Sequence, residues 1–185
     1  MKTKKTSCGK LSGIRIYLSG PIENAKDDGA SWRQQFISLT KENHLNFKII
    51  DPTNKHDDMV GEIAEERKKM RQLKKNGKFK QITKKMKWVR RWDLRACDYV
   101  HCLVVYIDPT IPSWGTPDEV YSVEDQQKPI FAVIEGGAYN APDWTFPVIK
   151  YNEMFSSVEE LVEHFKKLDS GQKRLDDRWV LIKNG

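Results

Sequence analysis

The sequence predicts an α/β fold in which an open, mainly parallel sheet carries helices on both faces. Three observations predict it. Strand-like and helix-like segments alternate along the chain. Two segments, 99–107 and 129–134, are almost continuously apolar, as central strands of a parallel sheet are. Gly or Pro follows the strand-like segments, as at Gly20-Pro21. We expect residues 1–185 to form a single domain, since this length suits one hydrophobic core.

Periodicity places the individual elements. Alternating β-branched and aromatic residues indicate strands, and Trp32, Phe36 and Leu39 recur at helical spacing. The predicted helices cover residues 28–43, 117–127 and 156–168, the last with Ser156 or Ser157 as its cap. The predicted strands cover residues 14–18, 47–50, 99–107 and 129–134, with a short strand at 146–149 and a last strand or ordered tail at 178–182.

The positive charge is concentrated in one segment. The formal net charge is +6, yet residues 62–91 hold 13 Lys and Arg against 3 Asp and Glu. Apolar residues at helical spacing flank Asn76-Gly77 there, so we expect a Lys-rich helical hairpin inserted at residues 56–91. Three interpretations stay open, namely a solvated helical face, a lid or phosphate clamp, and a nucleic-acid surface, which is possible but not favoured.

Other patterns exclude several protein classes. No apolar run approaches the roughly 18 residues of a membrane span, and no apolar stretch follows the basic N-terminus as in a secretory signal. The three cysteines, Cys8, Cys97 and Cys102, lack CxxC spacing and indicate reduced thiols, so we expect a cytoplasmic protein without membrane association. The four histidines share no metal-ligand spacing, and we expect no metal site.

The segment Ser113-Trp-Gly-Thr-Pro-Asp-Glu119 is the most informative for chemistry. A Gly-Thr turn leads into a helix whose first residues include Asp118 and Glu119, and a helix N-terminus stabilises an ionised carboxylate. Such a carboxylate can attack the anomeric carbon of a sugar. The alternative is that these two acids have no catalytic role, since Asp and Glu are common in the first turn of helices in general.

Two further segments carry candidate polar groups. Asp93 lies between Arg91 and Arg95, before the apolar segment 99–107, where it is either a surface ion pair or an acid for a leaving group. The segment Tyr17-Leu-Ser19-Gly20-Pro21 follows the first strand, and its Gly allows close approach of a ligand. In an open α/β sheet, ligands bind beyond the carboxyl ends of the strands.

Together these segments resemble the nucleoside 2-deoxyribosyltransferase superfamily, including its deoxynucleoside monophosphate N-glycosidase branch. The matching residues are Tyr17, Gly20, Asp93, Gly115 and Glu119. The resemblance covers roughly residues 14–55 and 89–135. The family has a Gly two residues after the nucleophile, where this chain has Tyr121; the family pattern implies close packing of helix and sheet there.

The resemblance implies a flavodoxin-like fold and an enzyme that cleaves or transfers at the N-glycosidic bond of a nucleoside or nucleoside monophosphate. It implies a glycosyl-enzyme intermediate on Glu119, an Asp93 that serves the leaving base, and a Tyr17 that positions the nucleophile. It implies no cofactor, a small-molecule substrate and a homo-oligomer. The alternative is a nucleotide- or nucleic-acid-binding module of the same fold without turnover.

The candidate substrate-binding residues come from the same loops. Ser19, Gly20 and Pro21 resemble the phosphate-approaching loop of the nucleotide hydrolase branch. Trp114 either stacks on a base or anchors its loop on the sheet. The other candidates are Asp51, Gly115 and Thr116.

Overall fold

The computed structural model describes residues 9–54 and 64–183. All strand pairs of its five-stranded sheet are parallel, in the order β2-β1-β3-β4-β5. The strands are β1 (Arg15–Ser19), β2 (Lys48–Ile50), β3 (Cys102–Ile107), β4 (Ile130–Ile134) and β5 (Met154–Phe155). This strand order is the flavodoxin-like one, which confirms the predicted fold class.

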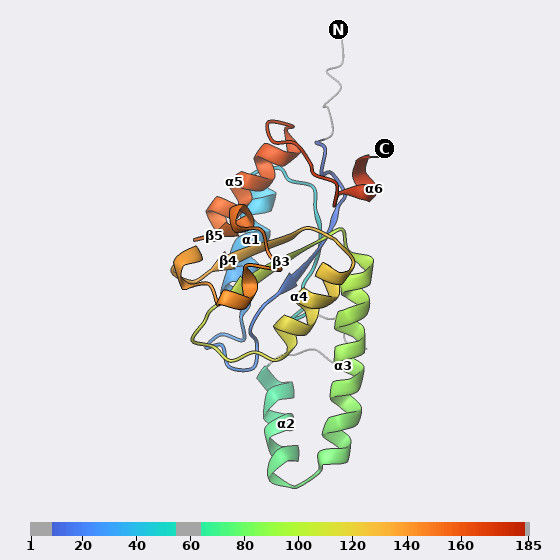
Figure 1. Ribbon diagram of the computed structural model, residues 1–185. Coiled ribbons are helices and arrows are strands. Elements are labelled where there is room, and N and C mark those ends of the chain that lie inside the picture. The colour runs from blue at the N-terminus through green and yellow to red at the C-terminus, as the bar shows by residue number, and fades with distance from the viewer. Residues whose placement is uncertain (1–8, 55–63, 184–185) are drawn as a thin grey trace.

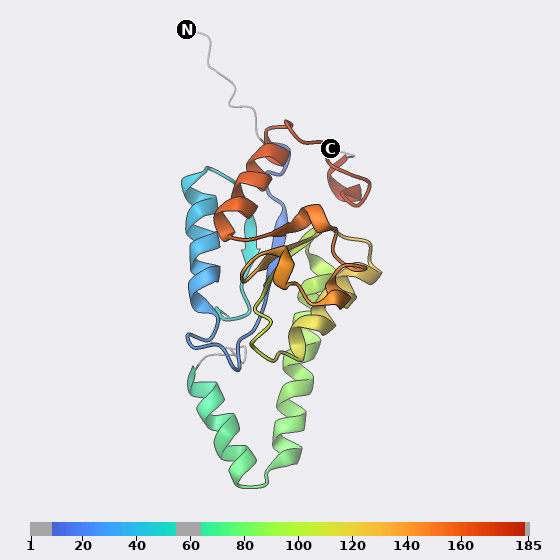
Figure 2. The ribbon, with the colours of Figure 1, turned by 60° about the vertical axis from the view of Figure 1, so that its left-hand side comes forward.

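Helices cover both faces of the sheet (Figures 1 and 2). On one face lie α1 (Ala30–Glu42) and α5 (Val158–Asp169); on the other lie α3 (Phe79–Tyr99) and α4 (Gly115–Asp125). Because side chains alternate along a strand, β1 sends Ile16 and Leu18 into the first core and Tyr17 into the second. Tyr17 therefore faces α3 and α4.

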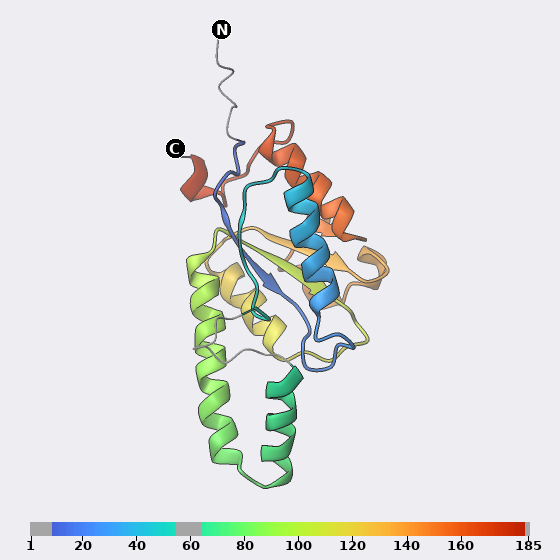
Figure 3. The ribbon, with the colours of Figure 1, turned by 180° about the vertical axis from the view of Figure 1, so that it is seen from behind.

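The basic segment forms a helical hairpin that projects beyond the sheet (Figures 1 and 3). Its helices are α2 (Ala64–Lys75) and α3, joined by a turn in which Gly77 has a φ of 64°. Helix α3 has 21 residues, and its second half packs on the sheet domain. The hairpin thus shares its second helix with the layer that covers the sheet. The predicted start of the insertion at residue 56 lies outside the described residues.

Three predicted elements differ from the observed ones. Helix α3 runs to Tyr99, so β3 begins at Cys102 and not at residue 99. The strand predicted at 146–149 is wrong: Ile149 is buried without strand pairing, and Pro147 lacks the N–H that a ladder needs. Of the two alternatives for residues 178–182, the last strand is wrong, because the short helix α6 (Val180–Lys183) forms there.

The predicted cap of the helix near residue 157 is confirmed. Ser157 caps α5, and its hydroxyl accepts a hydrogen bond from the Glu160 N–H at 3.3 Å. Cys97 and Cys102 are buried free thiols. In the described part of the chain, no helix is long and apolar enough to cross a membrane. The described residues also form short 3₁₀ helices, namely η1 (Ala138–Asn140), η2 (Asp143–Thr145) and η3 (Tyr151–Glu153).

Candidate active site

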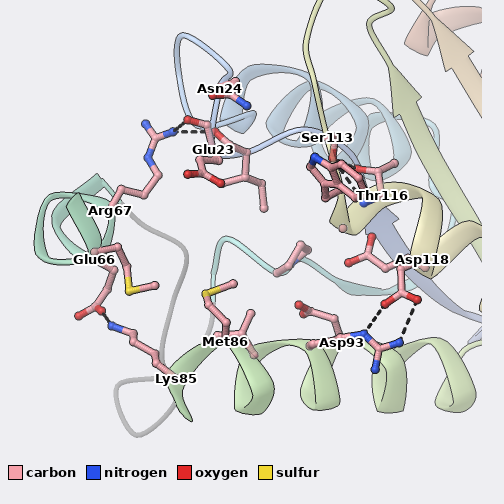
Figure 4. Close-up of a pocket in the computed structure, with 18 of the residues that line it drawn as sticks. Glu23, Asn24, Glu66, Arg67, Lys85, Met86, Asp93, Ser113, Thr116 and Asp118 are labelled. Carbon is pink, nitrogen blue, oxygen red and sulfur yellow. Dashed lines mark hydrogen bonds and ion pairs between the residues drawn. The ribbon is translucent and has the colours of Figure 1, made fainter. Parts of the chain in front are cut away.

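A cavity of about 590 Å³ lies between the helical hairpin, α4 and the loop that follows β1 (Figure 4). It therefore lies beyond the carboxyl ends of the central strands, where the architecture predicts a ligand. Asp93 and Glu119 line the end next to the sheet, and Met70, Ile82 and Met86 line the hairpin end. One cavity thus joins the sheet domain to the basic segment.

Four side chains from three segments that are distant in sequence meet at the sheet end of this cavity. The Tyr17 hydroxyl lies 3.0 Å from Asp93 Oδ1 and 3.1 Å from Glu119 Oε1. The Ser19 hydroxyl donates to the other Glu119 oxygen. Tyr17 and Ser19 are fully buried, and Asp93 is 7% exposed. The structure thus brings Tyr17, Asp93 and Glu119 together, and it adds Ser19 as a direct partner of Glu119.

The surroundings keep Tyr17 in its neutral form. Burial raises the pKa of Tyr17 well above its usual value, and the negative charges of Glu119 and Asp93 raise it further. A neutral phenol has one proton, so it can donate fully to one carboxylate at a time. The second contact becomes a hydrogen bond when the other carboxyl carries a proton of its own. Tyr17 is therefore a neutral donor placed between the two carboxyl groups.

The two adjacent acids of α4 have different partners. Glu119 is held by Tyr17 and Ser19, whereas Asp118 pairs with Arg90 through two contacts of 2.6 and 3.0 Å. Helix α4 begins at Gly115, two residues earlier than predicted, so Glu119 lies just past the first turn. The helix dipole acts mainly within that turn. The hydroxyl donors, more than the helix start, therefore stabilise the charge on Glu119.

The predicted substrate-binding residues divide into two groups. Gly20, Trp114, Gly115 and Thr116 line the cavity. Trp114 is 95% exposed, so it is not packed on the sheet. The cavity lining does not include Ser19, Pro21 or Asp51; Asp51 instead accepts hydrogen bonds from the backbone and hydroxyl of Thr53 at 2.8 and 2.7 Å.

Gly20 and Arg33 shape the loop after β1. A Cβ on Gly20 would lie 3.2 Å from the Tyr106 carbonyl oxygen, so a side chain at this position would press on the neighbouring strand end. The buried Arg33 guanidinium donates to the carbonyls of Gly29 and Gly20 at 2.7 and 3.2 Å. Arg33, which also lines the cavity, thus ties this loop to the start of α1.

The residue that fastens the hairpin across the cavity carried no signal in the sequence. Arg67 on α2 donates to the Ile22 carbonyl at 2.8 Å and to the Glu23 carbonyl (Figure 4). Arg67 also forms an ion pair with Asp28. Periodicity placed Ile82 and Met86 at helical spacing in one segment of the hairpin and Met70 in the other. It carried no signal that these side chains line the same cavity as the candidate catalytic carboxylates.

Tyr121 does not crowd the contact between α4 and the sheet. Its side chain is 45% exposed, while Val120 and Val123 provide the buried face of the helix. The implication of close packing at this position is therefore wrong, because the residue points toward solvent. Across residues 9–54 and 64–183, no three His, Cys, Asp or Glu side chains are grouped as metal ligands would be.

Among the solved structures that are similar to this chain are the following two. A conserved protein from Enterococcus faecalis is 19% identical with a TM-score of 0.54, and the match covers 84% of this chain and 99% of that one. A CMP N-glycosidase from Clostridium botulinum is 12% identical with a TM-score of 0.44, over 82% of this chain and 98% of that one. No protein-family model and no curated protein matches the sequence. At 19% identity, the first similarity shows a shared fold.

Proposed function

We propose that this protein cleaves or transfers at the N-glycosidic bond of a nucleoside or nucleoside monophosphate, through a glycosyl-enzyme intermediate on Glu119. The observation that carries the proposal is the pair of carboxyl groups bridged by one buried phenol at the cavity wall. Homo-oligomer formation and a cytoplasmic location stay predictions from the sequence.

The spacing of the two carboxyl groups supports a covalent intermediate. The Tyr17 hydroxyl contacts both, so the contacted oxygens of Asp93 and Glu119 lie no more than about 6 Å apart. Retaining glycosidases hold their two carboxyl groups about 5–5.5 Å apart, and inverting enzymes leave about 6.5–9.5 Å for a water molecule. The observed limit therefore favours a nucleophile over a base that activates water for direct attack.

The proposed reaction has two displacements. A Glu119 carboxylate oxygen attacks C1′ of the sugar, the C1′–N bond breaks, and its electron pair goes to the base, which receives a proton from Asp93. Water or a second base then attacks C1′ and releases Glu119, while Asp93 takes up the proton of the incoming group. Tyr17 and Ser19 hold Glu119 ionised and oriented, and Tyr17 stays neutral throughout.

The cavity also suits a phosphorylated substrate. Its volume of about 590 Å³ lies in the range of small-molecule sites, about 300–1,000 Å³. Arg71, Lys74 and Lys87 line it toward the hairpin, where they can attract a phosphate. Ser19 and Pro21 are absent from the cavity lining, so the hairpin cations are the better candidates for this contact.

The test is a turnover assay with a matched pair of variants. The purified protein is incubated with each common deoxynucleoside and deoxynucleoside monophosphate, with and without a second free base, and the bases are separated by chromatography. We expect Glu119→Gln to lose roughly a thousandfold or more of the activity. The adjacent Asp118→Asn removes the same charge from the same helix and should keep most of it.

The outcomes of this assay distinguish a transferase, a hydrolase and a non-catalytic binding module. Base exchange identifies a transferase, and base release without exchange identifies a hydrolase. Equal loss in the two variants would reject Glu119 as the nucleophile. Tight nucleotide binding without turnover by the wild-type protein would support the non-catalytic binding module instead.

A further inference from the structure

The cations of the hairpin fall into two classes. Five form ion pairs with acids: Arg67, Lys69, Lys74, Lys85 and Arg90. The remaining eight are exposed and make no ion pair with the acids that the structure describes: Lys68, Arg71, Lys75, Lys78, Lys80, Lys84, Lys87 and Arg91. The positive charge of this segment is therefore largely uncompensated, and it lies on a projecting part of the molecule (Figure 1).

Helix α3 arranges part of this charge in a line. Lys80, Lys84, Trp88, Arg91 and Arg95 follow one another at intervals of three or four residues and are all exposed. We call this set the α3 stripe. The opposite face of the helix is buried and carries Asp93 toward the cavity. At 1.5 Å per residue, the stripe extends for about 22 Å.

Trp88 distinguishes this stripe from a merely solvated helical face. Its side chain is 38% exposed and lies between Lys84 and Arg91 along the helix. Lys84 and Arg91 form no ion pair with the described acids, whereas Arg95 at the end of the stripe pairs with Asp98 at 3.3 Å. An aromatic ring between two unpaired cations can stack on an unpaired nucleobase while the cations contact the neighbouring phosphates. A duplex offers the phosphates but conceals the faces of its bases.

We propose that the α3 stripe is a docking surface for single-stranded nucleic acid, bound without regard to sequence. Flexible ammonium groups recognise phosphate as point charges, which gives affinity without base readout. An acidic membrane fits less well, because a membrane-bound helix needs an apolar face beside its cations. Here Met70, Ile82 and Met86 of the hairpin line the cavity. The proposal is independent of the reaction at Glu119, since the stripe and Asp93 lie on opposite faces of α3.

The test measures binding of a fluorescent thymidine homopolymer of about 20 nucleotides by anisotropy, over a series of salt concentrations. With about four phosphate contacts, log K should fall with log[salt] at a slope of about −3. The triple variant Lys80→Glu, Lys84→Glu, Arg91→Glu should bind at least about tenfold more weakly, with a shallower slope. The control Lys41→Glu, Lys48→Glu, Lys167→Glu changes the net charge equally at exposed lysines elsewhere, and should bind nearly as the wild type does.

A second pair of variants tests stacking. Trp88→Ala should weaken binding about tenfold without changing the salt slope, and Trp88→Phe should retain most of the affinity. Circular dichroism and thermal unfolding confirm that each variant is folded. Equal weakening by the two triple variants would overturn the proposal. Preference for a duplex of the same length, or binding to acidic vesicles but not to the homopolymer, would overturn it as well.

Discussion

The two ends of the cavity are held by different kinds of interaction. At the sheet end, Tyr17 and Ser19 are fully buried on β1 and contact a carboxyl group from each of two helices. At the hairpin end, most side chains are exposed, and α2 is attached to the rest of the protein through charged groups such as Arg67 and Lys74.

This difference assigns different tasks to the two ends. A buried, hydrogen-bonded cluster keeps reacting groups in one geometry, which is what chemistry at an anomeric carbon requires. A charged hairpin with few buried apolar residues opens at a smaller free-energy cost and can adapt to its ligand. We therefore expect changes at the sheet end to act on the chemical step and changes at the hairpin to act on binding.

The largest effect should come from Asp93→Asn, which keeps the shape of the side chain but removes the acid. For a nucleoside with a common base, kcat/KM should fall about 10²–10⁴-fold, because the leaving base no longer receives a proton. A deoxyriboside with a nitrophenol leaving group needs no proton and should lose far less. Equal losses for the two substrates, measured by steady-state kinetics, would mean that Asp93 has only a structural role.

An intermediate effect, a loss of folding stability, should come from lowering the pH, and it should arise in the sheet domain. Burial, followed by the charges of Lys173 and Lys167, lowers the pKa of His164 to about 4, beside the rings of Phe131 and Phe155. The His164 ring of the folded protein therefore stays neutral below pH 6.5, where the His164 ring of the unfolded chain binds a proton. The contribution of neutral His164 to the free energy of unfolding is therefore fully present above pH 6.5, and it is lost as the pH falls toward 4.

Because the His164 ring is only partly buried, we expect it to contribute about 1 kcal/mol to this loss. Urea unfolding at pH 7 and pH 5 measures the change. The free energy of unfolding of His164→Gln should change less between the two pH values than that of the wild type. The same substitution at the exposed His44 should leave this change as it is in the wild type. Identical pH sensitivity of the two variants would contradict the assignment.

The smallest effect on global stability should come from Arg67→Gln at the hairpin. The variant loses the ion pair with Asp28 and the hydrogen bonds to the loop after β1. We expect hydrogen exchange of α2 to become faster and KM to rise several-fold, with little change in kcat or in the exchange of β1. Lys69→Gln, which removes only a local pair with Glu66, is the control. A fall in kcat with KM unchanged would contradict the division of tasks.

The spacing of residues along the chain was enough to predict much of the sheet domain. Alternation at residues 14–18 predicted β1, which was found one residue later, and the apolar run at 129–134 predicted β4. The prediction failed at residues 146–149, where Ile149 is buried without strand pairing and Phe146 is exposed. Hydrophobicity reports that a residue is buried but does not report which backbone partner is available to it.

Short-range periodicity in the sequence by itself predicted an open, mainly parallel sheet and the helical hairpin, because the spacing of apolar residues encodes such elements. The resemblance to a known family singled out Tyr17, Asp93 and Glu119. Only the tertiary structure decided that Ser19 contacts Glu119, that Tyr121 faces solvent, and that Arg67 fastens the hairpin. It also decided which hairpin cations are paired. These facts depend on contacts between residues far apart in the chain, and such contacts are set by packing in three dimensions.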